Sequence, residues 1–162
     1  MIHPHTEVRW VSDEIGYGVF ATRPIAAGTI TYAWDPLEIE IGPDDSRLQD
    51  EALSEVIERY SYIDGRGVRI LSWDHAKFVN HSCDPNSLST GYGFEIAIRD
   101  IAKDEQLTDD YGMFNLPTPM NISCCETGCR GRVAGDDLDR HWREWDVKVR
   151  RAIDLFSDVP QP

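Results

Sequence analysis

The sequence has no long apolar segment. None of its apolar runs approaches the roughly eighteen consecutive residues that a membrane-spanning helix needs, so no membrane contact is expected. The first residues, Met1-Ile2-His3-Pro4-His5, lack the basic and apolar regions of a secretory signal peptide. We therefore expect an intracellular protein, located in the cytoplasm.

Basic residues are also scarce. The chain has 16 Lys and Arg residues against 29 Asp and Glu residues, which gives a formal net charge of -13. Direct binding to nucleic acid is not expected, because phosphates require a basic surface. The favoured partner is a basic protein or peptide. Between Asp35 and Glu58 the only basic residue is Arg47, and this acidic segment either steers a basic peptide or is a solvated surface.

Cysteine is rare as well, with 4 residues in a chain of 162 that fits one domain. Cys83 lies in the middle of the chain, whereas Cys124, Cys125 and Cys129 form a cluster near its end. Four thiolates suit a tetrahedral zinc ion. The alternative is a set of reduced cysteines in a structural turn, as expected in a reducing compartment.

Short strand-forming segments, separated by Gly and Pro, dominate the pattern and predict a mainly β protein with some helix. The expected strands are Val8–Val11, Tyr17–Ala21, Thr29–Trp34, Leu37–Ile41, Val68–Leu71, Phe94–Ile98 and Gln106–Thr108.

Two helices are expected. The first begins at a capping box of Ser46 and Gln49 inside the acidic segment. The second follows a stripe of apolar residues that we expect to pack into the core, and the residues after Phe156 are expected to form a frayed tail. The apolar face of the first helix comprises Leu48, Ala52, Leu53, Val56, Ile57 and Tyr60, and the stripe of the second comprises Leu138, Trp142, Trp145, Val149, Ala152 and Phe156.

Three segments combine polar groups with turns. Phe78-Val79-Asn80-His81-Ser82-Cys83-Asp84-Pro85-Asn86 places amide, imidazole and thiol groups beside a proline turn, where we expect the edge of a cleft. Gly16-Tyr17-Gly18-Val19-Phe20-Ala21 has two glycines that allow a ligand to approach the backbone. Glu105-Gln106-Leu107-Thr108-Asp109-Asp110-Tyr111-Gly112 ends a short strand on a tyrosine.

Taken in order, these segments resemble the SET-domain protein lysine methyltransferases, from about Val8 to Arg132. The resemblance implies a fold of several short antiparallel sheets with a threaded C-terminal segment, one inserted helix and a C-terminal helix. It divides the chain into a SET domain at 1–120 with an acidic helical insertion at about 42–60, a cysteine segment at 121–135, and a helix and tail at 136–162.

The resemblance also implies an activity: transfer of a methyl group from S-adenosylmethionine to a lysine side chain of a protein. Tyr111 matches the family's catalytic tyrosine, which orients the amine. Asp110 is expected to support the turn. The residues that match cofactor-binding positions are Gly16, Tyr17, Gly18, Phe78, Asn80 and His81.

The cysteine cluster resembles the family's post-SET segment, in which three cysteines join the cysteine of the central motif around one zinc ion. The candidate zinc ligands here are therefore Cys83, Cys124, Cys125 and Cys129. The match is imperfect, because Ile122 occupies the first ligand position and Cys125 is an additional neighbour of Cys124.

One further departure is Asp109, which stands where many family members have Phe or Tyr and where the number of added methyl groups is tuned. A catalytically silent SET-like module that binds basic peptides or the cofactor is therefore a second hypothesis. A metal hydrolase built on His75, His81, Asp109 and Asp110 is a third. A second copy of the chain could complete the substrate surface, as a homodimer.

Overall fold

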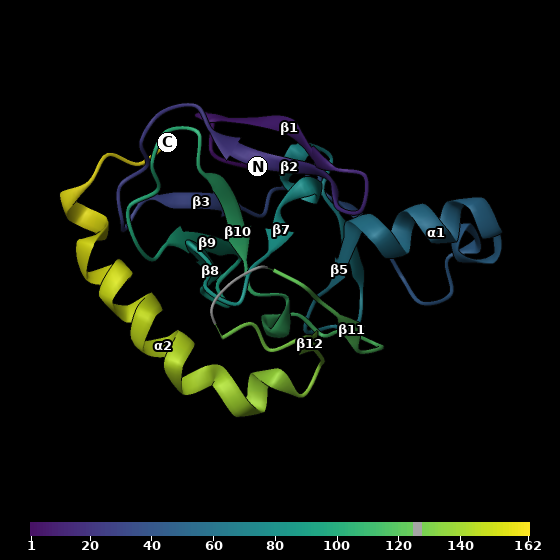
Figure 1. The fold of residues 1–162 in the computed structure, drawn as a ribbon. Helices are drawn as coiled ribbons and strands as arrows, with labels where there is room; N and C mark the ends of the chain where they lie inside the picture. Colours follow the sequence, from purple (N-terminus) through teal and green to yellow (C-terminus); the bar gives the residue numbers. More distant parts are fainter. Residues whose placement is uncertain (125–127) are drawn as a thin grey trace.

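The computed structural model describes residues 1–124 and 128–162, and within them the chain forms four small sheets and two α-helices (Figure 1). Each predicted strand segment overlaps one of the observed strands, which confirms the mainly β prediction. The strands that the sequence pattern did not predict are two or three residues long: β5, β7, β8, β11 and β12. No helix in the described ranges is both long and apolar enough to cross a membrane.

The sheet that organises the site has the strand order β1-β2-β10-β7. It consists of β1 (Thr6–Ser12), β2 (Gly16–Ala21), β10 (Gln106–Asp109) and β7 (Asn80–His81). Strand β10 pairs antiparallel with β2 and parallel with β7, so it lies between two segments that precede it by many residues. This pairing brings the three polar segments of the sequence together.

Three smaller sheets surround this one. The order β3-β9-β8 combines Ile30–Ala33, Phe94–Ala97 and Ser87–Ser89, and the order β4-β6-β5 combines Ile39–Ile41, Arg69–Leu71 and Ser61–Ile63. Strands β11 (Met120–Asn121) and β12 (Arg132–Val133) pair on either side of the cysteine cluster. Four 3-10 turns complete the described elements: η1 (Ser46–Gln49), η2 (His75–Phe78), η3 (Tyr111–Met113) and η4 (Phe156–Asp158). The threading of the C-terminal segment stays a prediction.

The main apolar cluster lies under β2 and β10. Val19 and Leu107 face each other across these strands and are fully buried, and Phe78 and Val79 pack against the cluster from η2. Burial of such side chains stabilises the fold by about 1.5–3 kcal/mol each. The cluster consists of Ile2, Val19, Ala21, Ile25, Ala97, Ile101 and Leu107.

The first helix begins later than the capping box predicted. Ser46 to Gln49 form the 3-10 turn η1, whereas helix α1 spans Glu51–Tyr60. Its N-cap is Asp50, whose side chain accepts hydrogen bonds from the backbone N–H groups of Ala52 and Leu53. A carboxylate next to the helix N-terminus also has the favourable charge, so Asp50 replaces the predicted Ser46 cap.

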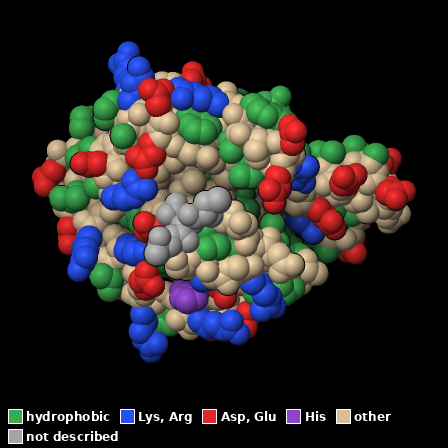
Figure 2. Space-filling model, in the orientation of Figure 1, with side chains coloured by type: hydrophobic (Ala, Val, Ile, Leu, Met, Phe, Trp, Pro, Cys, Tyr) green, Lys and Arg blue, Asp and Glu red, His purple; other side chains and the backbone are tan. Residues whose placement is uncertain are grey.

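The apolar face predicted for this helix is mostly exposed. Only Ile57 is buried, while Leu53 and Val56 are 47% and 49% exposed. Residues 42–60, called here the acidic lobe, project from the body of the molecule, and acidic side chains gather on their surface (Figures 1 and 2). The apolar residues of this helix therefore stay largely uncovered, because the lobe projects away from the core.

The second helix, α2 (Asp137–Leu155), packs against the strands β8 and β9. Trp145 and Val149 form a second apolar cluster with Leu88, as the stripe predicted. The two ends of the stripe were predicted wrongly, because Leu138, Trp142 and Phe156 are 42%, 45% and 36% exposed. The helix curves around the body, so only its middle and the Ala152 turn face the core (Figure 1).

The tail is anchored, not frayed. Beyond η4, the side chain of Gln161 donates hydrogen bonds to the carbonyl oxygens of Gly28 and Phe156, both at 3.0 Å. Its Oε1 atom accepts a hydrogen bond from the backbone N–H of Ile30 at 2.8 Å. One amide side chain therefore fastens the chain end to the start of β3, which the apolar pattern could not reveal.

Candidate functional site

Two cavities meet at Tyr111. The larger has a volume of about 560 Å³ and the smaller a volume of about 240 Å³. Both are partly lined by the same residues, so they are neighbours separated by a thin wall of side chains. The shared residues are Arg59, Tyr60, Lys77, Tyr111 and Met120.

The larger cavity contains four of the six predicted cofactor-binding residues. Tyr17, Phe78, Asn80 and His81 line it, from strand β2, turn η2 and strand β7. The rings of Tyr17 and Phe78 meet edge to face with centroids 5.6 Å apart, and Tyr60 contacts Phe78 in the same way at 5.4 Å. Aromatic edges, the Asn80 amide and three cationic side chains thus line one cavity; the cations are Arg59, Lys77 and Arg99.

The other two predicted residues, Gly16 and Gly18, do not line either cavity. At Gly18 a Cβ atom would lie 2.8 Å from Nε2 of Gln106 and 3.0 Å from Nδ2 of Asn80. The amide of Asn80 donates instead to the carbonyl oxygen of Tyr17 at 3.0 Å. Glycine is needed at position 18 so that neighbouring amides can approach the backbone.

At position 16 glycine is needed for a different reason. Its φ is +85°, a conformation that favours glycine, and it begins strand β2 after a tight turn. An added Cβ atom would lie 3.3 Å from the guanidinium of Arg59, which comes from helix α1. The turn and the acidic lobe therefore meet above the larger cavity.

Tyr111 is held by two hydrogen bonds. Its hydroxyl group donates to the carbonyl oxygen of Val79 at 2.8 Å, and its backbone N–H donates to Nδ1 of His81 at 3.1 Å. Burial raises the pKa of the Tyr111 hydroxyl above its ordinary value, and the charge of Asp109 adds to this effect. The hydroxyl therefore stays protonated and can orient a ligand as a neutral group.

Asp110 supports the tyrosine turn, as predicted. Its Oδ1 atom accepts a hydrogen bond from the backbone N–H of Gly112 at 3.0 Å and caps η3. The same carboxylate forms an ion pair with Arg130. This partly buried pair ties the turn to the segment that carries Cys129.

The smaller cavity has aromatic walls and an acidic floor. The rings of Tyr62 and Phe114 lie 5.2 Å apart, and Phe114 also lies beside Tyr111. Asp109 is only 1% exposed, and Glu95 from β9 lines the same cavity. Burial raises the pKa of Glu95 to about 7, and burial together with the charge of Glu95 raises the pKa of Asp109.

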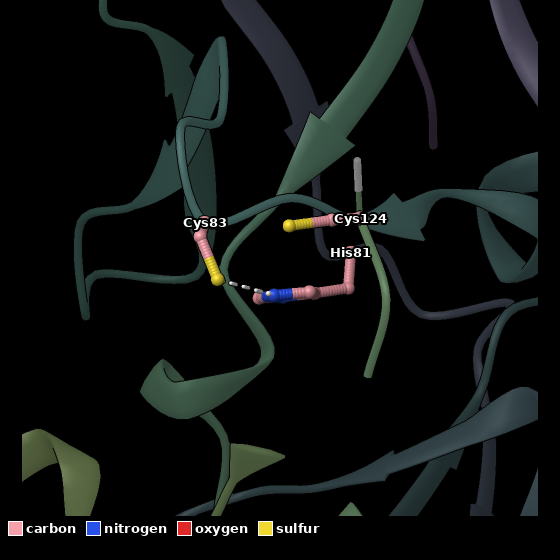
Figure 3. A group of neighbouring side chains, drawn as sticks. All are labelled: His81, Cys83 and Cys124. Atoms are coloured by element: carbon pink, nitrogen blue, oxygen red, sulfur yellow. Dashed lines mark hydrogen bonds between the residues drawn. The ribbon is translucent and has the colours of Figure 1, made fainter. Parts of the chain in front are cut away.

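Two of the predicted zinc ligands lie together with His81. The side-chain donor atoms of His81, Cys83 and Cys124 lie within 4.8 Å of one another and point toward a common space (Figure 3). Hydrogen bonds from the backbone of Cys124 and Gly131 lower the pKa of the Cys129 thiol to about 7. Side-chain hydrogen bonds also join Cys129 to the thiols of Cys124 and Cys83. Cys125 lies outside the described residues.

His81 serves the cluster as a hydrogen-bond donor. Because Nδ1 of His81 accepts from Tyr111, the proton of the neutral ring is on Nε2, which lies 3.3 Å from Sγ of Cys83. The backbone N–H of Arg130 reaches the same sulfur at 3.4 Å. Three converging thiols with N–H donors around them fit a thiolate-bound zinc ion.

The four residues suggested for a metal hydrolase do not form one cluster: Nδ1 of His81 lies 3.8 Å from Oδ1 of Asp110, but His75 is bonded elsewhere. Nε2 of His75 is hydrogen-bonded to the Thr6 hydroxyl at 2.8 Å, and His75 lines neither cavity. In the described part of the chain, His81, Cys83 and Cys124 form the only cluster with metal-ligand spacing. Asp109 and Asp110 belong to the floor and to the turn instead.

Several site residues were missed from the sequence. Arg59 and Tyr60 end the acidic helix, and Tyr62 and Phe114 form the walls of the smaller cavity. Glu95 is a single carboxylate in an apolar strand, which is a detectable signal because such a group is rarely buried without a reason. The other residues lie in segments without a distinguishing pattern.

Comparison with known proteins agrees with this geometry. Residues 16–112 match the SET domain family. The curated relatives include the histone H3-lysine(4) N-trimethyltransferase ATX1 of Arabidopsis thaliana, 33% identical over 129 residues, which cover 73% of this chain and 12% of that protein. They also include the histone-lysine N-methyltransferase ATX2 of the same plant, 27% identical over 148 residues, which cover 84% of this chain and 13% of that protein.

Solved structures are similar in fold. The structure of KRYPTONITE in complex with mCHG DNA and SAH gives a TM-score of 0.51 at 21% identity, and covers 75% of this chain and 27% of that one. The chain thus spans only 13% and 12% of the length of the two curated relatives ATX2 and ATX1. Its three polar segments, its short sheets and its family match lead to one conclusion: the chain belongs to the SET domain family.

Proposed function

We propose that the protein transfers a methyl group from S-adenosylmethionine to a lysine side chain of a protein substrate. The observation that carries this proposal is the meeting of two cavities at Tyr111. A donor in the larger cavity and an amine in the smaller one would face each other across this residue. Alignment of reacting groups at about 3–3.5 Å can supply most of the acceleration of such a transfer.

The larger cavity suits the proposed donor. The carboxylate of S-adenosylmethionine needs a cation, which Arg59 or Lys77 can provide. The base and sugar of the donor need aromatic and amide groups, which Tyr17, Phe78 and Asn80 can provide. When bound, S-adenosylmethionine would supply a methyl group on a cationic sulfur, and the amine nitrogen would displace this sulfur, which keeps the electron pair of the broken carbon–sulfur bond. The chain's own residues bind and orient these groups.

The smaller cavity suits a slender side chain with a polar end. Tyr62, Phe114 and Tyr111 provide apolar walls that exclude water from the stem of a lysine. Val79 presents a carbonyl oxygen beside the Tyr111 hydroxyl, so two oxygen atoms can accept N–H bonds from the amine. Fixing both N–H groups directs the nitrogen lone pair toward the donor.

We also propose that Cys83, Cys124 and Cys129 bind zinc, since three thiols converge beside the larger cavity. Zinc content of protein purified without chelator tests this directly. About one zinc per chain is expected, and Cys83→Ser should lower the content. Fewer than one zinc per several chains would remove the site from the proposal.

The proposed substrate is basic. The acidic lobe borders both cavities through Arg59 and Tyr60, and the smaller one also through Glu58. Acidic side chains dominate the surface of the lobe (Figure 2). A negative surface next to the amine channel favours the approach of Lys-rich peptides. The named activity of the relatives, histone-lysine methylation, makes core histones the first substrates to test.

Isothermal titration with S-adenosylmethionine, followed by labelling of core histones with methyl-labelled donor, tests the proposed activity. Binding and labelling of lysine residues are expected. Binding without labelling of histones, ribosomal proteins or cell lysate would favour the silent module instead. Absence of both S-adenosylmethionine binding and labelling would contradict the proposed methyltransferase activity and a cofactor-binding silent module alike.

A further inference from the structure

Strand β1 forms one edge of the sheet that organises the site and has a neighbouring strand on one side only. That neighbour is β2, and no strand lies beyond β1 in the described part of the chain (Figure 1). An edge strand presents unpaired backbone N–H and C=O groups, which proteins usually cover or disrupt. With 7 residues, β1 is the longest of the described strands, so its open edge is long enough to pair with another strand.

The backbone groups on this open edge can be assigned from a hydrogen bond next to it. The N–H of Thr22 donates to the carbonyl oxygen of His5 at 2.9 Å, which makes His5 a hydrogen-bonded position of the β1–β2 pair. Such positions alternate along an antiparallel pair, so Glu7 and Arg9 also direct their backbone groups toward β2. The N–H and C=O groups of Val8, between them, therefore point to the open edge.

The side chains on one face of this edge are apolar and uncovered. Val8 pairs with the buried Val19, yet 37% of Val8 is exposed. Trp10 is 56% exposed and packs edge to face on Tyr17, with ring centroids 5.2 Å apart. A strand placed beside β1 would cover Val8 and Trp10, and their burial would favour its binding.

The other face of β1 carries one charge of each sign. The guanidinium of Arg9 lies 2.7 Å from the carboxylate of Glu7 and 2.6 Å from that of Asp104. All three side chains are at least 35% exposed, so they can accept a further charged neighbour. Glu7 and Arg9 stand on either side of Val8, and an antiparallel copy of the strand presents them in the reverse order.

These charges select one register for two antiparallel β1 strands. When the pairing is centred on Val8, the outward N–H and C=O groups of the two Val8 residues face each other, and Glu7 of each copy lies opposite Arg9 of the other. A centre at position 7 places Glu7 opposite Glu7, and a centre at position 9 places Arg9 opposite Arg9. Like charges directly opposite each other destabilise a strand pair.

We propose that the protein forms a homodimer in which the two β1 strands pair antiparallel about Val8 and join the two sheets into one. The self-complementary order of Glu7 and Arg9 favours a second copy of this chain over an unrelated strand. Each copy carries a formal net charge of -13, and salt screens this repulsion beyond about 8 Å at physiological ionic strength. The dimer does not depend on the proposed methyl transfer.

Sedimentation of the full chain at physiological ionic strength, over a range of protein concentrations, tests the dimer. The wild type should pass from monomer to dimer as its concentration rises. Glu7→Arg or Arg9→Glu alone places like charges opposite each other, and each should weaken self-association about tenfold or more. An equal mixture of these two variants should associate again, because every opposed pair then has opposite charges.

The mixture separates the interface from damage to the fold, since two misfolded variants would not restore each other. The matched control is Arg66→Glu, because Arg66 also pairs with two carboxylates, those of Glu40 and Asp64, but lies outside β1. This control should associate like the wild type. A wild type that stays monomeric at every concentration, or a mixture that does not associate, would overturn the inference.

Amide hydrogen exchange locates the interface. The amides of Glu7 and Arg9 should be protected at every concentration, whereas that of Val8 should gain protection only as the dimer forms. Val8→Pro removes this outward N–H without breaking a bond to β2, so it should abolish association while thermal unfolding still shows a folded protein.

Two outcomes of the exchange experiment would contradict the proposal. Dimer formation without protection of the Val8 amide would place the interface elsewhere. Protection of this amide in a monomer, seen only after a Lys-rich peptide is added, would make a peptide the occupant of the edge instead of a second copy. If Val8→Pro does not fold, the charge-reversed mixture still decides the proposal.

Discussion

The hydroxyl group of Tyr111 and the carbonyl oxygen of Val79 are joined by a hydrogen bond of 2.8 Å, although 32 positions separate the two residues. Strand β10 pairs in parallel with β7, with Asp109 beside His81, so the side chain of Tyr111 after β10 reaches back along the pair to Val79, the residue before β7. It fixes the phenol oxygen at the boundary between the two cavities.

Tyr111→Phe should therefore impair turnover and leave binding of S-adenosylmethionine nearly unchanged. The phenylalanine ring keeps the packing against His81 and Phe114 but loses the oxygen that orients the amine. We expect turnover to fall by about 10²-fold or more, measured by labelling kinetics and by titration with the donor. Unaltered turnover would remove Tyr111 from the mechanism.

Gly18→Ala should weaken binding of S-adenosylmethionine. The new Cβ atom would lie 3.0 Å from the Asn80 amide and 2.8 Å from the Gln106 amide, so the Asn80 side chain must move out of its place in the larger cavity. About tenfold weaker binding is expected, from the loss of one well-placed hydrogen bond. The control is Gly65→Ala, where a Cβ atom meets nothing within 4 Å; equal affinities in the two variants would contradict the prediction.

Gly28→Ala should destabilise the fold. Gly28 has a φ of +90°, and a Cβ atom there would lie 2.8 Å from Cβ of Leu155 in helix α2. Gly67→Ala is the matched control, because Gly67 also has a positive φ but has open space around it. The control should cost about 1–2 kcal/mol of unfolding free energy and Gly28→Ala clearly more. Denaturant unfolding measures both free energies. Equal losses in the two variants would contradict the prediction, because they would mean that helix α2 can shift away from position 28 at no cost.

The contribution of Glu95 to the unfolding free energy should fall as pH rises from about 4.5 to about 7, opposite in sign to the contribution of His81, whose pKa burial lowers to about 4. Burial raises the pKa of Glu95 from 4.5 to about 7, so the folded protein binds more protons than the unfolded chain in this window. The stabilising contribution of the protonated Glu95 is complete below 4.5 and is lost as pH rises through 7. The carboxyl and hydroxyl groups that affect this titration are Asp109, Tyr62 and Tyr111.

Glu95→Gln should remove this contribution, because the amide does not titrate, so the unfolding free energy of the wild type minus that of the variant should fall across the window. Denaturant unfolding at a series of pH values between 4 and 8 tests this. Identical slopes in the two proteins would show that Glu95 does not titrate in this window.

Arg130→Ala should loosen the segment that carries Cys129. The guanidinium of Arg130 pairs with the buried Asp110, and removal of one partner leaves the other charge buried, at a cost of about 3–5 kcal/mol. Hydrogen exchange of residues 128–133 and zinc content should both report the change. Arg132→Ala, at an exposed position in the same segment, is the control.

The strands and the cluster of site residues were predictable for physical reasons. Alternating and β-branched residues mark β1, β2 and β9, and the turn residues around Asn80 and Tyr111 mark the ends of β7 and β10. Strands of two or three residues, such as β7 and β11, carry too few positions for a pattern and form only because a neighbouring strand is present.

Other features depend on contacts that sequence patterns do not record. Asp50 and Ser46 are both good N-caps, and the choice between them depends on where η1 ends. Leu53 and Val56 have helical spacing, but whether a helix is covered depends on the rest of the fold. Glu95 joins Asp109 only because β9 and β10 bring them to the same cavity.

Helix α2 touches the body closely at two distant points. Near its start a Cβ atom on Gly112 would lie 2.9 Å from Cβ of Asp137, and near its end Leu155 lies against Gly28. Because α2 is in contact at both ends, a displacement of the residues at one end is transmitted along the helix to the other. A ligand that shifts the tyrosine turn η3 must therefore either bend helix α2 or displace the start of strand β3, to which Gln161 is hydrogen-bonded. A spectroscopic probe near Leu155 or Gln161 would then report ligand binding at Tyr111.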